Sequence, residues 1–244
     1  MSIIIFTTKQ MDGINSTVHH MKPEKIQLVI WDCDGVLVDS EHLATKAFHN
    51  IILELGGTST YDEVYHSLKG GSIYKAIDYV KAQAIVPESF LIEQEYRSRS
   101  FELFKQELKA VAGVESILQS LQVNQSVASN GPQIKILHNL EVTGLLKHFK
   151  REHIFSGHDI QKFKPDPDLF IHVATTLNYA PYQCLIIEDS EHGAHAAKLA
   201  GMQCFGYAAE TNVESFLKYD AIPFYNMAEL ERHLEKLGLW EEVC

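Results

Sequence analysis

The sequence has no long apolar run, and this absence excludes several classes of protein. No stretch approaches the ~18 consecutive apolar residues that a membrane-spanning helix needs, and the apolar segment at residues 2–6 is too short for a secretion signal. The chain also has only four cysteines and no C-x-x-C pair, so we expect no disulfide framework. Together these absences predict a cytoplasmic protein with no membrane attachment.

Positive charge is also scarce. The chain carries 21 Lys and Arg residues against 32 Asp and Glu residues, which gives a formal net charge of −11 at pH 7. Nucleic acids and anionic membranes are bound by basic surfaces, so neither is expected as the main partner. A small anionic substrate is compatible with this charge, because a local site can oppose the field of the whole molecule. Nothing in the sequence sets the oligomeric state, and a monomer is compatible with it.

The material for a full hydrophobic core is present. Apolar residues make up 45% of the 244 positions, enough for one large domain or two modest ones. An apolar run at residues 26–31 has the pattern of a buried parallel strand. Helical patterns then fill residues 40–108, and from residue 111 onward strands and helices alternate. This alternation predicts an α/β fold whose core is a Rossmann-like, doubly wound parallel sheet.

The helical segment interrupts the first strand–helix unit of that sheet, so we expect it to form a cap over the end of the first strand. Within it, Thr60 and Glu63 form a capping box. Ser72 caps a further helix, and Pro87 opens a long helix that runs to about Leu108. The expected domains are an N-terminal extension over 1–24, a catalytic core over 25–39 and 110–244, and a helical cap over 40–109.

Strands and helices are expected to alternate through the rest of the core. The expected strands are 123–128, 154–155, 184–187, 204–207 and 222–225. The expected helices are 114–121, 133–146, 168–177, a helix of small residues that includes 193–200, and 228–237.

Two carboxylates spaced by one residue follow the first expected strand. Asp32 and Asp34 leave that strand at its carboxyl end, where open α/β sheets bind ligands. Residues i and i+2 of an extended chain point the same way, and Gly35 permits a tight turn after them. Two neighbouring anions repel each other unless a cation lies between them. A divalent metal with one spare carboxylate indicates phosphoryl chemistry.

The two aspartates have different candidate roles in this chemistry. Asp32 is the candidate nucleophile, because a carboxylate can form an aspartyl-phosphate and so divide hydrolysis into two steps. Asp34 is then free to protonate the leaving alkoxide and later to deprotonate the attacking water.

Polar residues also follow other expected strands. Ser129 offers a hydroxyl to a phosphate oxygen, and the backbone amides of Asn130 and Gly131 can add to it. Lys164 offers a positive charge for the transferring phosphoryl group. Each of these is also a common turn or surface residue. Their joint occurrence, in order and at strand ends, is what indicates a site.

An acidic pair provides the remaining candidate metal ligands. Glu188 and Asp189 follow another expected strand, although this segment can also cap the next helix. Magnesium takes oxygen ligands and keeps several waters. Asp32, the Asp34 carbonyl and Asp189 would therefore suffice from the protein, with Glu188 assisting.

These motifs together give the chain a family likeness. It resembles the haloacid dehalogenase superfamily, in the β-phosphoglucomutase-like branch that has a helical cap after the first motif. The matching stretches are DCDGVLVDSE (32–41), SNG (129–131), KPDPDLF (164–170) and IIEDSEHGAHAAKLAG (186–201). The resemblance implies a Rossmann-like core, a magnesium cofactor and an aspartyl-phosphate intermediate.

The branch contains phosphatases and a sugar-phosphate mutase, and two positions bear on the choice between them. The mutase pattern has a histidine four residues after the hinge hydroxyl, whereas here Ser40 is followed at that distance by Ala44. The mutase also has an arginine three residues after a Leu-Lys-Gly of the cap, where this chain has Ile73 and so lacks a bidentate partner for a second phosphate. Both departures favour hydrolysis. Mutase activity is the alternative, and a catalytically silent binding module is a third hypothesis, which would expect the loss of the acidic and lysine residues that are present.

The amino-acid sequences of two segments bear on the substrate. SNGP (129–132) and FSGHDIQKFKPDP (155–167) are similar to bacterial sugar-phosphate phosphatases of the 6-phosphogluconate phosphatase type. We therefore predict a magnesium-dependent phosphatase that hydrolyses a small phosphorylated metabolite, a sugar or sugar-acid phosphate. Lys69 is the cap residue expected to contact a polar or acidic substrate, and a solvent-facing loop lysine is the alternative interpretation.

Overall fold

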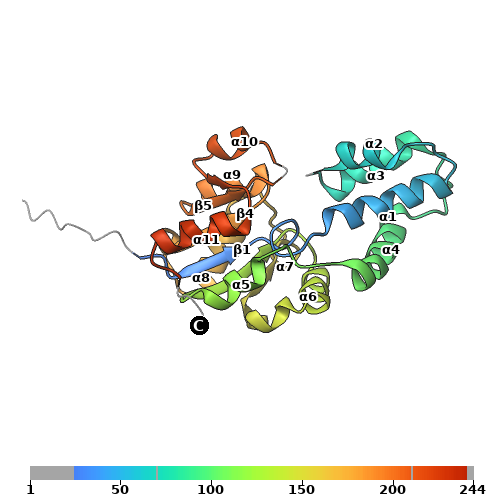
Figure 1. The fold of residues 1–244 in the computed structure, drawn as a ribbon. Coiled ribbons are helices and arrows are strands. Elements are labelled where there is room, and N and C mark those ends of the chain that lie inside the picture. Colours follow the sequence, from blue (N-terminus) through green and yellow to red (C-terminus); the bar gives the residue numbers. More distant parts are fainter. Residues whose placement is uncertain (1–24, 70, 210, 241–244) are drawn as a thin grey trace, which may run out of the picture.

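The computed structural model describes residues 25–69, 71–209 and 211–240 (Figure 1). The extension expected over residues 1–24 lies outside the described residues. The described chain forms a sheet with helices on both faces, and a separate group of helices lies beyond the end of the sheet toward which strand β1 points (Figure 1). Among the described residues, no helix is both long and apolar enough to cross a bilayer.

Six parallel strands form the sheet, in the order β3-β2-β1-β4-β5-β6. The strands are β1 (Leu28–Trp31), β2 (Asn124–Ser129), β3 (Ile154–Ser156), β4 (Cys184–Glu188), β5 (Gln203–Tyr207) and β6 (Ile222–Phe224). The chain adds β2 and β3 on one side of β1 and then β4, β5 and β6 on the other. Winding therefore reverses between β1 and β4, and sheets of this kind bind ligands at the carboxyl ends beside such a reversal. The doubly wound parallel sheet expected from the sequence is confirmed.

Helices cover both faces of the sheet because its strands carry apolar side chains on both sides. In β1, Val29 and Trp31 join one apolar cluster, whereas Leu28 and Ile30 join the other, and all four are fully buried. The first cluster packs on α5 (Val114–Ser120), α6 (Gln133–Val142) and α11 (Met227–Lys236). The second cluster packs on α8 (Asp168–Thr176), α9 (Glu191–Leu199) and α10 (Val213–Leu217).

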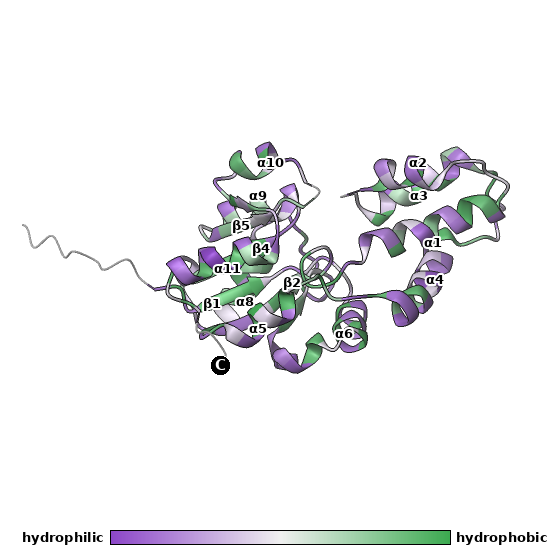
Figure 2. Ribbon diagram, viewed as in Figure 1, coloured by the Kyte–Doolittle hydropathy of each residue, from purple (hydrophilic) through white to green (hydrophobic). Residues whose placement is uncertain are grey.

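The inserted segment forms four helices with an apolar cluster of their own. They are α1 (Glu41–Glu54), α2 (Tyr61–Leu68), α3 (Ile73–Gln83) and α4 (Ile92–Glu107). The cluster between them consists of Phe48, Ile51, Ile52, Val64, Ala76, Val80 and Ile92. Hydrophilic residues cover much of α2 and α4 (Figure 2). The expected capping box of Thr60 and Glu63 opens α2, and Ser72 caps α3, as predicted.

Two short segments connect these helices to the sheet. Val38 pairs with Ala110 in an isolated antiparallel bridge where the chain leaves and returns. At the end of α4, Phe104 and Leu108 belong to the apolar cluster of the sheet and not to that of the inserted helices. We propose that residues 40–109 form the cap domain and that these two connections are its hinge.

The expected start of the long cap helix is wrong. α4 begins at Ile92 and not at Pro87. Proline suits the first turn of a helix, but here Pro87 opens a separate turn in which its carbonyl accepts a hydrogen bond from the Phe90 N–H at 2.9 Å. Proline fixes its own backbone torsion equally well in both settings, so the sequence signal does not distinguish them.

The expected end of the helix over 133–146 is also wrong, because α6 ends at Val142. Gly144 has a φ of +74°, a left-handed conformation that closes the helix and that glycine adopts at little cost. The chain then continues as a 3-10 turn over Leu145–His148. The short helices α7 (Gly157–Ile160) and α10 were not expected, since neither is long enough to show an apolar period.

Candidate active site

The predicted site residues other than Lys69 meet at the carboxyl edge of the sheet. Asp32 directly follows β1, Ser129 ends β2 and Glu188 ends β4, and these three strands are neighbours. The Asp32 N–H donates to the Ile187 carbonyl at 2.9 Å, which fixes the exit of the chain from β1 beside the end of β4. Lys164 enters from the loop between α7 and α8.

Lys164 is the centre of this arrangement. Its Nζ donates to Asp32 Oδ1 at 2.5 Å, to Glu188 Oε1 at 2.6 Å and to the Ala128 carbonyl at 2.9 Å. The Lys164 side chain is only 3% exposed, so its three donors are met by three protein acceptors away from bulk water. The ammonium thus joins the ends of three strands at one point.

The loop that carries Lys164 is held by Asn130. The Asn130 side chain accepts a hydrogen bond from the Lys164 N–H at 2.8 Å and donates to the Lys164 carbonyl at 3.2 Å. The Ser156 hydroxyl holds the turn that carries Asn130 by donating to the Gly131 carbonyl at 2.7 Å. The Asn130 side chain therefore positions the lysine, while its expected contact to phosphate through the backbone amide stays a prediction.

Glu188 has protein donors on both carboxylate oxygens. Oε1 accepts from Lys164, and Oε2 accepts from the backbone N–H and the hydroxyl of Ser190, each at 2.8 Å. Gly193 makes room for it, because a Cβ at that position would overlap the Glu188 carboxylate. This geometry favours a role in holding Lys164 over the expected role in assisting a metal.

Asp189 lies against the turn that follows the first strand. A Cβ on Gly35 would overlap the Asp189 carboxylate, and Gly35 has a φ of +84°. Glycine is therefore favoured here both by the lack of space and by the left-handed backbone. The Asp189 carbonyl accepts from the Thr211 hydroxyl at 2.7 Å. The structure thus brings the Asp189 side chain next to the backbone that carries Asp34.

Asp34 is held by three donors that differ from those around Lys164. Its Oδ1 accepts from the Ser40 hydroxyl at 2.6 Å and from Asn139 Nδ2 at 3.3 Å, and its Oδ2 accepts from Lys135 Nζ at 2.7 Å. Burial alone would raise the pKa of Asp34, but Lys135 and the Ser40 hydrogen bond hold that pKa below its usual range. Asp34 is therefore a carboxylate in this arrangement.

Ser129 lies close to Asp34 through the turn after β2. The Ser129 hydroxyl oxygen accepts from the Gly131 N–H at 3.0 Å. A Cβ built on Gly131 would lie 3.4 Å from Ser129 Oγ and 3.8 Å from Asp34 Oδ2, so both oxygens border this turn. The Ser129 hydroxyl keeps its proton for another acceptor.

Buried negative charge exceeds positive charge around Lys164. Burial raises the pKa of Asp32 to about 7, with Lys164 opposing the rise and Glu188 adding to it. Burial, Glu188 and Asp32 hold the pKa of Asp189 well above its usual range. Burial would lower the pKa of Lys164, but Asp32 and Glu188 outweigh it and raise that pKa. One ammonium faces three carboxylates, so the site attracts a further cation.

A comparison with protein families identifies the family of the chain. A family model described as haloacid dehalogenase-like hydrolase matches residues 29–207, which is most of the chain. The chain belongs to the haloacid dehalogenase-like hydrolases. The resemblance noted in the sequence is confirmed, and the chain is a phosphoric monoester hydrolase of this family.

Curated and solved relatives agree with this assignment. The chain is 33% identical over 207 residues to a 6-phosphogluconate phosphatase of Escherichia coli, a match that covers 84% of this chain and 93% of the relative. It is 28% identical over 185 residues to a phosphorylated carbohydrates phosphatase of Thermotoga maritima, covering 73% of this chain and 83% of that protein. A crystal structure described as a putative β-phosphoglucomutase from Thermotoga maritima superposes with a TM-score of 0.75 at 26% identity, covering 86% of this chain and 99% of that one.

The donor set of this hydrolase fits a hard divalent cation. Asp32 and Asp189 offer carboxylate oxygens whose negative charge the nearby ammonium does not fully offset. The Asp34 backbone offers a carbonyl. Within the described part of the chain, no three His, Cys, Asp or Glu side chains converge on one point where they could hold a metal. Two carboxylates, a carbonyl and waters match magnesium, which keeps part of its hydration.

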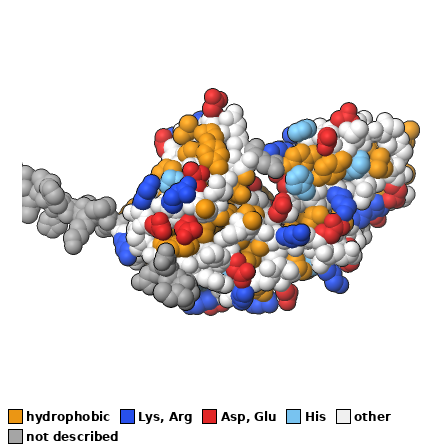
Figure 3. All heavy atoms as spheres, viewed as in Figure 1, with side chains coloured by type: hydrophobic (Ala, Val, Ile, Leu, Met, Phe, Trp, Pro, Cys, Tyr) orange, Lys and Arg blue, Asp and Glu red, His pale blue; other side chains and the backbone are white. Residues whose placement is uncertain are grey.

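Lys69 differs from the other predicted site residues, because the structure places it on the cap and not at the sheet edge. It directly follows Leu68, the last residue of α2, and its Nζ lies 5.7 Å from the centroid of the Tyr65 ring. Tyr65 in turn stacks on His42, with ring centroids 4.6 Å apart. Figure 3 shows histidine side chains on the part of the cap that faces the sheet-bearing half. The contact of Lys69 with substrate stays a prediction.

Lys135 and Asn139 were not among the predicted site residues. Both lie on α6, one turn apart, and both reach Asp34. The four-residue spacing of Lys135 and Asn139, soon after the Ser-Asn-Gly turn, is a usable signal, because residues i and i+4 share one helix face. Which way that face points depends on the packing of α6, and the sequence alone does not give it.

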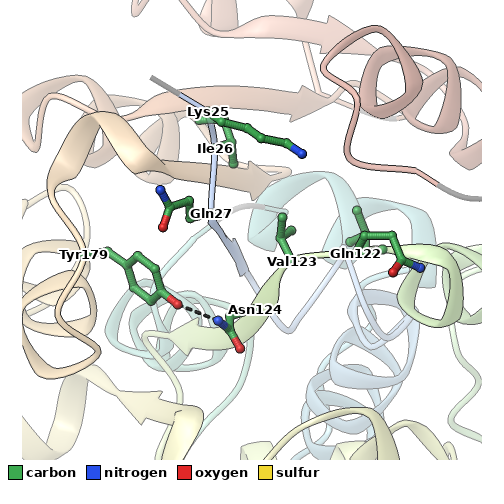
Figure 4. A pocket seen from close by; sticks show the side chains of 8 residues that line it. Lys25, Ile26, Gln27, Gln122, Val123, Asn124 and Tyr179 are labelled. Carbon is green, nitrogen blue, oxygen red and sulfur yellow. Dashed lines mark hydrogen bonds between the residues drawn. The ribbon is translucent and has the colours of Figure 1, made fainter. Parts of the chain in front are cut away.

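A hollow of ~530 Å³ lies at the opposite edge of the sheet (Figure 4). Its lining includes Gln27, Val123 and Asn124, which lie at or before the amino ends of β1 and β2. Asn124 Nδ2 donates to the Tyr179 hydroxyl across it (Figure 4). The position of this hollow is the reverse of where open α/β sheets bind ligands, so we do not assign it to the active site.

Proposed function

We propose that this chain is a magnesium-dependent phosphatase that hydrolyses a small phosphorylated metabolite through a phosphorylated Asp32. The observation that carries the proposal is the buried contact of Lys164 with Asp32 and Glu188, with Asp34 on a separate set of donors beside it. The arrangement supplies a carboxylate nucleophile, a fixed positive charge and a second carboxyl group for proton transfer.

In the first half of the reaction, the phosphoryl group binds between Asp32 and the turn that carries Ser129. The Ser129 hydroxyl donates to a phosphoryl oxygen, and the Lys164 ammonium offsets the negative charge that gathers there. Asp32 attacks phosphorus through Oδ2, the oxygen that does not face Lys164, and the bond from phosphorus to the leaving oxygen breaks. Asp34, a carboxylate in the free site, takes up a proton when the substrate binds and gives that proton to the leaving oxygen, so an alcohol leaves.

In the second half, a water molecule attacks the phosphorus of the aspartyl-phosphate. Asp34, now a carboxylate, takes a proton from that water as the new bond forms. The bond between phosphorus and Asp32 breaks, which restores the Asp32 carboxylate and releases inorganic phosphate. Asp34 ends the cycle protonated, ready for the next leaving group.

The proposed magnesium ligands are Asp32, Asp189 and the carbonyl of Asp34. Haloacid dehalogenase-like phosphatases generally use this ion, and its charge would offset that of the phosphoryl oxygens. Glu188 belongs to the Lys164 side of the site, because both of its carboxylate oxygens are taken by protein donors.

A sugar or sugar-acid phosphate is the proposed substrate class. The E. coli and Thermotoga relatives are described as phosphatases of 6-phosphogluconate and of phosphorylated carbohydrates. Lys69 is the proposed cap contact for an acidic or hydroxyl-rich substrate. Ala44 and Ile73 stand where the mutase pattern has histidine and arginine, so we propose hydrolysis and not isomerisation.

The proposal is tested by assaying phosphate release from sugar phosphates, sugar-acid phosphates and nucleotides, with and without magnesium. We expect magnesium-dependent release that favours the first two classes. Asp32→Asn should lower kcat by on the order of 10⁴-fold or more, as the loss of a nucleophile does. Asp39→Asn is the matched control, because the Asp39 side chain is exposed. Substantial turnover by Asp32→Asn would refute the proposed nucleophile, and sugar-phosphate interconversion with little free phosphate would indicate a mutase.

A further inference from the structure

We propose that Lys135 is a positioning residue for the second half of the reaction, in which its ammonium aims the Asp34 carboxylate at the attacking water. The inference rests on the proposed function. It adds a residue of the helix α6 to a chemistry that otherwise uses groups at strand ends and in the loops that follow them.

The contacts of Asp34 show which oxygen faces the reaction. Ser40 and Asn139 both donate to Oδ1, whereas Lys135 donates to Oδ2 at 2.7 Å. Oδ2 is also the oxygen that borders the Gly131 turn, where Ser129 presents its hydroxyl. The oxygen fixed by Lys135 is therefore the one beside the proposed phosphoryl site.

The Asp34 carboxylate has room for one more donor. A carboxylate has about four acceptor positions, and the described side chains of Ser40, Asn139 and Lys135 fill three of them. A water molecule that donates to the remaining position of Oδ2 is held by the same oxygen that will take its proton.

Lys135 is itself held from the cap side. Its Nζ lies 5.6 Å from the centroid of the Phe104 ring, and Phe104 belongs to α4 of the cap and is 1% exposed. An ammonium over an aromatic face is attracted by the ring. Lys135 is thus fixed by a carboxylate on one side and by a cap residue on the other, while its side chain is 28% exposed and accessible to water.

The structure contains two separate groups of lysine and carboxylate, and they suit different steps. Lys164 contacts Asp32 and Glu188, so it serves the nucleophile and the phosphoryl group. Lys135 contacts Asp34 alone among the described acidic side chains. Loss of Lys135 should therefore slow the step in which Asp34 acts on water and leave the attack by Asp32 largely unchanged.

The test uses Lys135→Met, which keeps the length of the side chain and removes its charge. The substrate is p-nitrophenyl phosphate, whose leaving group departs with little help from an acid, so kcat/KM reports phosphorylation of Asp32 and kcat reports water attack. We expect kcat to fall ~10- to 100-fold, the loss expected for a hydrogen bond to a charged group. We expect kcat/KM to change less than threefold, and a burst of nitrophenol equal to the enzyme concentration should precede slow turnover.

Two further variants separate positioning from structural support. Lys135→Arg keeps the charge and should restore kcat to within about threefold. Lys147→Met, an exposed lysine just beyond the same helix, should change neither constant. A parallel fall of kcat and kcat/KM without a burst, or no change in either constant, would overturn the inference. If Asp32→Asn also remained active, the proposed function itself would have failed.

Discussion

At the scale of single residues, the central feature is a lysine whose side chain is almost fully buried. Burial of an ion pair is costly unless the geometry satisfies every donor and acceptor, and removal of one partner leaves an uncompensated charge. Lys164 meets this condition through Asp32, Glu188 and the Ala128 carbonyl. Its position is therefore set by three strand ends at once, and each partner influences where its charge lies.

Replacement of Glu188 by glutamine tests what this carboxylate does. Glu188→Gln removes one charge beside Lys164 and keeps the shape of the side chain. We expect kcat to fall ~10-fold or more, because a hydrogen bond to a charged group is worth about 1.5–3 kcal/mol. The magnesium concentration that gives half-maximal activity should stay within a few-fold of the wild-type value.

The comparison variant is Asp189→Asn, which should raise that magnesium concentration far more than Glu188→Gln does. Glu191→Gln, a change at a half-exposed side chain one turn away that contacts Lys218 and Tyr219 instead of Lys164, should leave both quantities unaltered. If Glu188→Gln weakens magnesium activation as strongly as Asp189→Asn, Glu188 is a metal ligand and the role assigned here is incorrect.

At the scale of elements, α9 shows how a helix can be adapted to a neighbouring charge. Ser190 caps this helix by accepting from the Gly193 N–H at 3.0 Å, and the same Ser190 donates to Glu188. Glycine in a helix interior costs about 1 kcal/mol relative to alanine. At Gly193 this cost is offset by the space it leaves for the Glu188 carboxylate.

Gly193→Ala should therefore act against the ordinary preference of a helix. We expect the melting temperature to fall or stay level, where an exposed helix site would gain stability, and kcat to fall ~10-fold as Glu188 is displaced from Lys164. Thermal unfolding and steady-state kinetics measure both effects. Lys198→Ala on the exposed face of the same helix should leave kcat unchanged. Full activity with higher stability in Gly193→Ala would show that the close approach to Glu188 does not matter.

How far the sequence predicts this molecule also depends on the element. Asp32, Ser129 and Glu188 could be placed at one edge because strand ends of a parallel sheet share that edge. Lys135 could not, since its direction follows from how α6 packs against α4. The prediction of where α4 begins was wrong because Pro87 fits a turn and a first helical turn equally well. Long apolar periods and strand ends carry a strong signal, whereas helix faces depend on partners far away in the chain.

At the scale of the whole molecule, the charge balance and the local site agree. The chain has a formal net charge of −11, and its site collects more carboxylates than ammonium groups. Cations are therefore favoured near the site, and the folded protein should bind magnesium more tightly than the unfolded chain does.

Magnesium should consequently stabilise the fold as well as support activity. At one hundred times its dissociation constant, a ligand of the folded state adds about 2.7 kcal/mol, which corresponds to a rise in melting temperature of roughly 5–10 °C for a protein of this size. Differential scanning fluorimetry with magnesium, against sodium at equal ionic strength, measures this shift. Asp189→Asn should abolish it, and Asp159→Asn, an exposed change, should not. An equal melting temperature in both salts would count against the proposed metal site.

The insertion of α1–α4 between two neighbouring points of the chain has a consequence for how the substrate specificity of such an enzyme can change. Val38 and Ala110 touch, so a replacement module needs only two ends that start close together. The cap keeps its own apolar cluster, and that interior can be rebuilt without disturbing the residues that handle phosphate. The limit of this freedom is the last turn of α4, where Phe104 is part of the other cluster and stands over Lys135. New specificities should therefore arise from exchange upstream of Phe104, with that aromatic ring retained.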